Sequence, residues 1–339
     1  MTTKTVLVLG ATGGIGGAMA HTLLARGWQV RALTRSGTPG LRDGILWQRG
    51  DALAAADVAR AAEGASLIVH AVNPPGYRDW DRLVLPMLAN TLAAARAGGA
   101  RLLLPGTVYN YGPDVFAPGA PLITEDAPQA PLTRKGAIRV AMERELEAAA
   151  ARGDSPVLIV RAGDYFGPQA ANNWFGQVLV KAGTAPRSIQ YPGRAGVGHQ
   201  WAYLPDVAET MARLVERDDL PAFARFHMDG HWDDDGTRMI GAIRRVLGAP
   251  DLPVKAFPWT LARLASPVVP LFRELMEMRY LWQEPVRLDN GRLRATLGAE
   301  PHTPLDEAVR ASLIGLGCLR AAPQTSGGPD LRQEFGAAP

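Results

Sequence analysis

Three glycines near the N-terminus, Gly10, Gly13 and Gly16, have a spacing that suits the phosphates of a dinucleotide. Gly10 permits a tight turn, Gly13 lets the backbone approach a pyrophosphate, and Gly16 lets a helix pack on the preceding strand. Free N–H groups at the start of that helix would face the phosphates, helped by the helix dipole. We therefore predict a dinucleotide site made by Gly10, Thr12, Gly13, Gly14, Ile15 and Gly16.

The segments around these glycines are the ones that such a site needs. An unbroken apolar run at residues 6–9 predicts a buried parallel strand before the turn. Helical spacing follows at residues 18–26, and a second strand-like run at residues 28–33. Strand, glycine turn, helix and strand in this order are the context that supports dinucleotide binding.

The second strand is followed by a residue that bears on the choice of cofactor. A carboxylate that binds the ribose 2′-OH of NAD is expected about 20 residues beyond the glycines. The chain has Thr34, Arg35 and Ser36 there instead. An arginine without a carboxylate suits a 2′-phosphate, so we predict NADP in preference to NAD. The alternative is that Arg35 is an ordinary solvated charge.

Further apolar runs at residues 45–48, 66–70, 101–104 and 156–160 alternate with helical segments. This alternation predicts an α/β fold, a Rossmann-type doubly wound parallel sheet, with a smaller C-terminal α/β substrate domain. Residues 1–163 would form the cofactor domain, to which residues 195–230 return, and residues 164–320 would form most of the substrate domain. The tail, residues 321–339, is rich in Gly, Pro and Ser, and we expect it to be disordered. Ala71 and Asn73 follow a strand end that should border the cofactor.

The glycine turn reads G-A-T-G-G-I-G, and this G-x-x-G-x-x-G form resembles the extended and atypical branches of the short-chain dehydrogenase/reductase superfamily. Residues 104–113 resemble the S-S-x-x-V-Y-G segment of extended members such as UDP-sugar epimerases. The resemblance implies that Thr107 is the catalytic hydroxyl, which donates a hydrogen bond to the substrate oxygen. It also implies that Asp51 contacts the adenine amino group, although Asp51 equally suits the N-cap of the next helix.

The chain departs from that family at one place. Extended members carry Tyr-x-x-x-Lys, and here the two positions hold Lys135 and Arg139, although Pro128, Pro131 and Glu143 keep the usual surroundings. The usual mechanism needs a phenol that exchanges a proton with a carbonyl oxygen. That phenol is absent from position 135.

Helical periodicity places Lys135 and Arg139 beside the apolar stripe of Ile138, Met142 and Leu146, so both cations should face inward. They also lie in the first turn after a predicted Thr133 N-cap, where the helix dipole disfavours cations. We expect an anionic partner there, either a ribose-phosphate or a substrate carboxylate. The alternative is a surface pair without function.

These residues together favour an NADPH-dependent oxidoreductase, either a reductase or an epimerase/dehydratase-type enzyme, acting on a small carbonyl or hydroxyl compound. Lys135, made easier to deprotonate by the neighbouring arginine, would act as acid/base, Thr107 would orient the substrate oxygen, and Arg139 would hold the nicotinamide ribose. Tyr109 and Tyr111 are alternative proton donors. The competing hypothesis is a catalytically silent NADP-sensing regulator of the atypical branch. The residues expected to face the substrate are Asn73, Tyr109, Tyr111, Asp164, Trp174 and His199.

Composition narrows the remaining possibilities. The 339 residues are 47% hydrophobic and 20% charged with a net charge of +3, which is ordinary for a globular protein and a poor match to nucleic-acid binding. Cys318 is the single cysteine, so we expect neither an internal disulfide nor a metal site. We find no signal peptide and no membrane span, and therefore expect a cytoplasmic protein. The apolar residues 257–272 suggest a lid or the surface of a homodimer.

Overall fold

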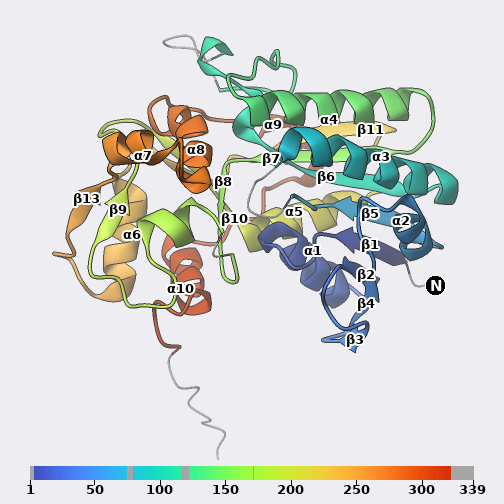
Figure 1. Cartoon of the computed structure of the whole chain (residues 1–339), viewed down its shortest axis with the longest axis horizontal. Helices are drawn as coiled ribbons and strands as arrows, with labels where there is room; N and C mark the ends of the chain where they lie inside the picture. Colours follow the sequence, from blue (N-terminus) through green and yellow to red (C-terminus); the bar gives the residue numbers. More distant parts are fainter. Residues whose placement is uncertain (1–3, 75–78, 116–121, 171, 322–339) are drawn as a thin grey trace, which may run out of the picture.

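The computed structural model describes residues 4–74, 79–115, 122–170 and 172–321. The predicted disordered tail therefore lies, apart from residue 321, outside the described residues. Figure 1 shows two parts: a large sheet flanked by helices, and a smaller part built mainly from the C-terminal third of the chain.

An eight-stranded sheet forms the larger part, and all its neighbouring strands are parallel except the last pair. Its order is that of a doubly wound Rossmann sheet, with the reversal of strand order beside the first strand. From one edge to the other the strands are β11 (Phe223–His227), β7 (Val157–Ala162), β6 (Arg101–Thr107), β5 (Leu67–His70), β1 (Thr5–Leu9), β2 (Gln29–Thr34), β4 (Ile45–Arg49) and β3 (Gly40–Arg42).

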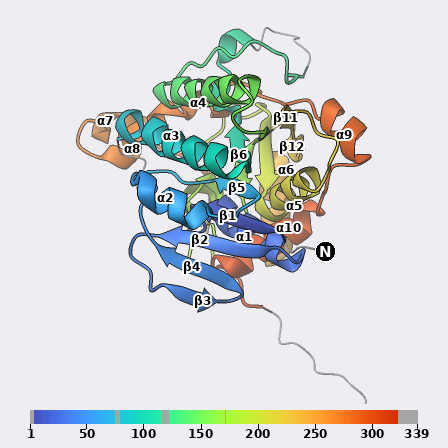
Figure 2. The same cartoon turned by 90° about the vertical axis from the view of Figure 1, so that its right-hand side faces the viewer.

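Helices cover both faces of this sheet (Figure 2). They are α1 (Gly14–Ala25), α2 (Ala55–Ala62), α3 (Trp80–Gly98), α4 (Arg134–Ala151) and α5 (Leu204–Val215). Val6 and Val8 of β1 pack with α1 and α5, whereas Leu7 and Leu9 pack with α2, α3 and α4. Because successive side chains of a strand point to opposite faces, an unbroken apolar run is what a strand covered on both sides requires.

The segment between β2 and β4 contains β3, which pairs antiparallel with β4. Asp43 and Gly44 join the two strands with φ of 51° and 76°, the backbone that a two-residue hairpin turn needs. Pro86 lies inside the continuous α3.

The smaller part has two short sheets and its own aromatic core of Phe175, Trp201 and Trp282 among others. Among the described residues, one-turn helices η2 (Val108–Asn110), η3 (Pro113–Val115) and η5 (Arg279–Trp282) and a π-helical turn, η4 (Phe175–Leu179), connect longer elements. The remaining strands are β8 (Asp164–Phe166), β9 (Ile189–Tyr191), β10 (His199–Tyr203), β12 (His231–Asp233) and β13 (Val254–Ala256), and the remaining helices are α6 (Thr237–Leu247), α7 (Trp259–Ala265), α8 (Pro270–Glu277), α9 (Gly291–Leu297) and α10 (Leu305–Gly315). Of these, α9 packs through Leu293 with the core of the large sheet.

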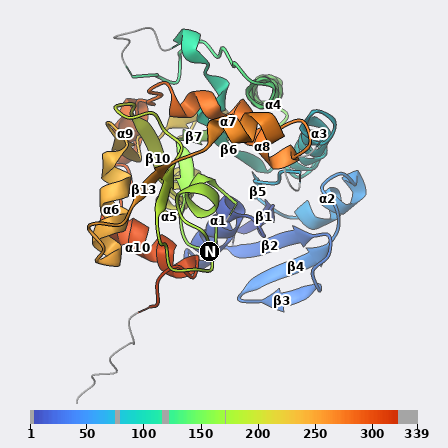
Figure 3. The same cartoon turned by 60° about the vertical axis from the view of Figure 1, so that its left-hand side comes forward.

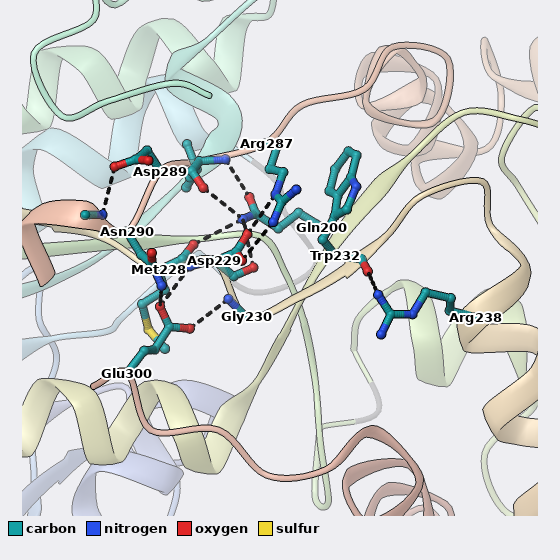
Figure 4. Close-up of polar contacts among 12 residues, drawn as sticks. Gln200, Met228, Asp229, Gly230, Trp232, Arg238, Arg287, Asp289, Asn290 and Glu300 are labelled. Carbon is teal, nitrogen blue, oxygen red and sulfur yellow. Dashed lines mark hydrogen bonds and ion pairs between the residues drawn. The ribbon is translucent and has the colours of Figure 1, made fainter. Parts of the chain in front are cut away.

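A polar cluster ties the C-terminal segment to the connection between β11 and β12 (Figure 4). Glu300 accepts hydrogen bonds from the backbone N–H groups of Asp229 (2.9 Å) and Gly230 (2.7 Å). Arg287 forms a two-pronged ion pair with Asp229, with both N–O distances at 3.0 Å. These bonds fix how the chain leaves the large sheet and enters the smaller part. Among the described residues, no helix combines the length and apolarity needed to span a bilayer.

Candidate functional site

The glycine turn has the geometry of a phosphate cradle. Gly10 has φ of 88°, and a Cβ there would lie 2.4 Å from the carbonyl oxygen of Ala71. A Cβ on Gly16 would lie 2.2 Å from the carbonyl oxygen of Gly10, so both positions need glycine for space. Gly13 is different, because it is exposed and a Cβ there would meet only the Gly10 carbonyl oxygen, at 3.3 Å. The space outside Gly13 is therefore open to a ligand.

Helix α1 begins at Gly14 without a side-chain cap among the described residues, so its first N–H groups are available to an anion. Thr12 is exposed beside them and Ile15 is half-buried. Gly14 itself lies under Ala170 and Leu204, which a Cβ would approach to 3.1 Å. These residues fit the pyrophosphate of a dinucleotide, and the smaller part of the molecule approaches the turn closely.

Two residues predicted for the adenosine half of the cofactor lie at the ends of neighbouring strands. Arg35 is exposed directly after β2. Asp51 follows β4, but it does not cap α2, whose N-cap is Ala54. The N-cap interpretation of Asp51 was wrong, because its carboxylate accepts the N–H of Leu53 and closes a local turn instead.

Thr107 and Tyr109 lie at the end of β6, both half-buried. The Tyr109 N–H donates to the Thr107 hydroxyl at 3.3 Å, and the Tyr109 hydroxyl donates to Asp164 Oδ1 at 3.4 Å. Asp164 belongs to β8, so predicted residues from two separate segments come together here.

Lys135 and Arg139 are 5% and 7% exposed, which confirms that both face inward. The predicted Thr133 N-cap is also confirmed, since its hydroxyl accepts the N–H of Gly136 at 3.0 Å. Arg139 donates to Asn73 Oδ1 at 3.0 Å, which joins α4 to the strand end expected to border the cofactor. Both cations also lie near the ring of Trp80.

Lys135 has an anionic partner that the sequence analysis did not identify. Its ammonium pairs with Glu274 and, at 3.6 Å, with Glu277, both on α8. The backbone N–H of Lys135 also donates to Glu277, at 2.8 Å. This carboxylate therefore interacts favourably with the positive end of the helix dipole at the start of α4. In Figure 3, α7 and α8 lie beside the α3 and α4 side of the molecule. The sequence contains one indication of this contact. Glu274 and Glu277 are three residues apart, so they share one face of a helix, but they lie 139 and 142 residues after Lys135.

Tyr111 is not a substrate residue in this structure, and that prediction is corrected. It is fully buried, and its hydroxyl contacts Arg161 and His227. Burial raises the pKa of Tyr111 to about 12, so the phenol is a poor proton donor at neutral pH. Arg161 in turn pairs with Glu143 inside the same cluster.

His199 and Trp174 lie in the aromatic core of the smaller part. The ring of His199 stacks on Trp282, with centroids 3.8 Å apart and planes 8° apart, and its Nε2 lies 3.1 Å from Asp164 Oδ2. Trp174 is buried and packs edge-on against Trp282, the residue on which His199 stacks. A small cavity of about 10 Å³ adjoins this group, lined by Val108, Asp164, His199, Gln200, Leu281 and Val286.

A larger cavity of about 340 Å³ lies elsewhere, beside the polar cluster of Figure 4. None of the predicted cofactor or substrate residues lines it. Its walls are Asp229, Gly230, His231, Trp232, Asp234, Arg238, Arg287, His302 and Leu305. Within the described part of the chain, no group of three or more His, Cys, Asp or Glu side chains is arranged to hold a metal ion.

Comparison with known proteins agrees with this fold. The model of the NAD dependent epimerase/dehydratase family matches residues 6–223. A curated relative, a 3-diazoavenalumate denitrifying reductase of Streptomyces sp, is 30% identical over 275 residues, which cover 76% of this chain and 85% of the relative.

Solved structures share the fold at lower identity. A putative epimerase from Burkholderia cenocepacia superposes with a TM-score of 0.72 at 20% identity, over 94% of this chain and 99% of the other. A UDP-glucuronic acid 4-epimerase from Bacillus cereus, solved with UDP-glucuronic acid and NAD, gives 0.72 at 14% identity over 92% and 98%. At these identities the superpositions establish the architecture.

Proposed function

The chain belongs to the NAD dependent epimerase/dehydratase family, and from this premise we propose that it is an NADPH-dependent reductase of a small aromatic compound. Membership makes it an NAD(P)-dependent oxidoreductase or epimerase/dehydratase that uses a nicotinamide cofactor. Three points are our proposal: that the reaction is a reduction, that the cofactor carries the 2′-phosphate of NADPH, and that the substrate is a small aromatic compound.

Lys135 and its carboxylate partners favour a reductase over an epimerase. An epimerase removes a proton and later returns one, so it needs a group that serves as base and then as acid. Here the phenol of the family is replaced by Lys135, whose ammonium is already paired with Glu274 and Glu277. A net reduction needs only the delivery of one proton with the hydride. The similarity to a reductase supports the same choice.

Residues of this chain would hold NADPH along the carboxyl edge of the sheet. Gly13 and the first turn of α1 would bind the pyrophosphate, Arg35 the 2′-phosphate, and Arg139 with Asn73 the nicotinamide ribose. The bound cofactor supplies the hydride. Thr107 would hydrogen-bond the substrate oxygen, and Lys135 would act as acid/base only after releasing its carboxylate partners.

We propose a planar substrate with a carbonyl group or a diazo group conjugated to an oxygen. The aromatic residues near Asp164 and His199 suit an apolar ring better than a sugar diphosphate. The curated relative is named for a diazo compound. A carbonyl takes one hydride and one proton to become an alcohol. An ortho-quinone diazide takes the same two to become a phenol, with its C–N bond broken and dinitrogen released.

The test is a fluorescence titration with NADPH and NADH, followed by NADPH oxidation with 4-hydroxybenzaldehyde and with 2-hydroxybenzenediazonium. We expect NADPH to bind more tightly, and one probe or both to be reduced. Arg35→Ala should weaken NADPH binding about 10- to 100-fold and leave NADH binding unchanged, as expected for the loss of one charged hydrogen bond. Arg152→Ala, at the far end of α4, is the matched control. Equal binding of both cofactors by the parent protein would refute the NADP assignment.

A second candidate, a silent NADP sensor, is favoured by one observation: the family's catalytic position holds a cation neutralised by two carboxylates. Tight NADPH binding with neither probe reduced would support the sensor and overturn the reductase.

A further inference from the structure

Lys135 is closed off from any substrate in this structure. It is 5% exposed, and its ammonium pairs with Glu274 and, at 3.6 Å, with Glu277. Both carboxylates belong to α8, which lies beside α3 and α4 in Figure 3. The proposed reaction brings a substrate oxygen to Lys135, so at least one of these contacts has to open first.

The start of α4 holds Lys135 beside the end of β6. A Cβ on Gly136 would lie 2.2 Å from the carbonyl oxygen of Tyr109, so α4 packs directly on the segment that follows Thr107. The ring of Trp80, at the start of α3, has its centroid 6.0 Å from the Lys135 ammonium. The contact with α8 therefore joins the smaller part of the molecule to the place where the substrate oxygen is expected.

The two carboxylates of α8 are held differently. Glu277 accepts the backbone N–H of Lys135 at 2.8 Å in addition to facing its ammonium. Tyr280, just beyond α8, donates to the carbonyl oxygen of Tyr111 at 3.1 Å, which fixes this end of the helix. Among the described residues, Glu274 pairs with the Lys135 ammonium but accepts no backbone N–H. Glu274 is therefore the carboxylate that can leave while Glu277 stays.

The helices α7 and α8, together with the turn between them, are packed lightly; this segment, residues 259–277, is called the lid below. Of the side chains that are described in it, only that of Ala262 is buried. Leu264 and Val268 are 71% and 81% exposed. An element with few buried apolar contacts opens at a low cost in free energy, which is the property that active-site lids need.

Charge balance favours an anionic oxygen as the group that replaces Glu274. Lys135 and Arg139 are both buried and carry two positive charges, which Glu274 and Glu277 match with two negative ones. Because a buried charge has to stay paired, an anionic oxygen can replace one carboxylate at the ammonium, whereas a neutral group cannot. The released Glu274 can pair in water with its neighbour Arg273, whose side chain is 64% exposed and already lies within 3.9 Å.

We infer that the lid covers the substrate site and that Glu274 occupies the position of an anionic oxygen of the substrate. This inference rests on the proposed function, and it narrows the substrate to a small aromatic compound with an ionised oxygen, as in a carboxylate or a phenolate. When that oxygen meets Lys135, Glu274 leaves and the lid opens about Glu277. Glu274 thus determines specificity by competition, and it is not a catalytic residue.

Titration calorimetry in the presence of NADP⁺ tests this exchange without turnover. The probes are 4-hydroxybenzoate and 4-hydroxybenzamide, which have nearly the same shape and differ in charge. We expect the acid to bind more tightly than the amide, and Glu274→Gln to tighten the acid further by about two- to fivefold, the value of one partly solvated ion pair. Glu284→Gln, exposed beyond α8, is the matched control and should change neither affinity. Unchanged or weaker binding of the acid to Glu274→Gln would overturn the inference, and so would a failure of the acid to bind.

Amide hydrogen exchange gives a readout that a purely structural ion pair would not move. In the parent protein, 4-hydroxybenzoate should speed exchange in α8, because it displaces the carboxylate that holds the lid. In Glu274→Gln that contact is already lost, so the acid should cause little further change. The amide should leave exchange in α8 as it is in both proteins. Exchange in α8 that the acid leaves unchanged or slows in the parent protein would contradict the lid.

Failure of the lid and failure of the reductase are distinguishable. Oxidation of NADPH with the two compounds of the preceding section tests the reductase, whereas binding and hydrogen exchange test the lid. A protein that reduces either compound while its α8 does not respond to the acid would keep the reductase and lose the lid. A lid that responds in a protein that reduces neither compound would overturn the reductase and leave the exchange at Lys135 standing.

Discussion

Two buried ion-pair clusters depend on α4, and they differ in what surrounds them. Near the middle of the helix, Glu143 accepts from Arg161, Asn110 and Gln129, with side chains of Glu143 and Arg161 2% and 0% exposed. At its start, Lys135 pairs with Glu274 and Glu277, whose side chains are 18% and 23% exposed. The first cluster lies in the interior of the large sheet's domain, and the second joins that domain to α8.

The comparison indicates that the cost of breaking an ion pair depends on how deeply its carboxylates are buried. Breaking a pair in the interior leaves a charge without water or partner, so the protein must keep it closed. In the second cluster the carboxylates are 18% and 23% exposed and can regain water, and the buried Lys135 ammonium has two of them, so losing one contact leaves it paired. A contact that has to open for substrate must be of the second kind. The predictions below test this contrast.

Glu143→Gln should have the largest effect. The guanidinium of Arg161 would remain buried without its counter-charge, and we expect a loss of about 3–5 kcal/mol in the free energy of unfolding. Urea denaturation followed by circular dichroism measures it. Glu147→Gln, on the exposed face of the same helix, should change stability by less than about 0.5 kcal/mol. A loss near that of the control would mean that the interior cluster is not structural.

Acid should weaken the fold through two buried histidines, of which His227 contacts Arg161 of the interior cluster. Burial, and then the charge of Arg161, lowers the pKa of His227 to about 3, and burial lowers the pKa of His70 to about 3 as well. In the unfolded chain both titrate near 6.5, so between pH 6.5 and about 3 the unfolded state binds more protons. Stability is therefore lost as pH falls through that window, by up to about 1.4 kcal/mol per pH unit for each histidine.

The variant His227→Gln should reduce this slope, and His21→Gln on the surface of α1 should not. Urea midpoints measured at several pH values give the slope directly. An identical slope in His227→Gln and the parent protein would remove His227 from the account.

Glu274→Gln should have the smallest effect on stability, about 1 kcal/mol or less, because the pair is at the edge and Lys135 keeps Glu277. Amide hydrogen exchange in α8 should nevertheless become faster, since that helix would be held less firmly on α4. High salt should produce the same change in the parent protein. Glu284→Gln, exposed a few residues beyond α8, is the control. Unchanged exchange in α8 would show that the contact does not hold this helix.

Local sequence was a good guide wherever a residue's role depends on its neighbours in the chain. The strand, glycine turn and helix around Gly10 are readable because the apolar run, the spaced glycines and the helical period follow one another along the chain. Gly16 also answers a local steric demand, since a Cβ there would meet the Gly10 carbonyl oxygen. The inward direction of Lys135 and Arg139 followed from helical periodicity, which is also local. Tyr111 was misjudged because its partners, Arg161 and His227, lie 50 and 116 residues away.

The sequence by itself thus determined the Rossmann architecture, the glycine turn and the inward position of the lysine at 135. Only the tertiary structure decided which polar groups meet: Lys135 with α8, and Asp164 with Tyr109 and His199. The physical reason is that steric and periodic preferences act over a few residues. A buried charge instead takes whatever partner the packing of distant segments brings within about 4 Å, where its interaction is strongest.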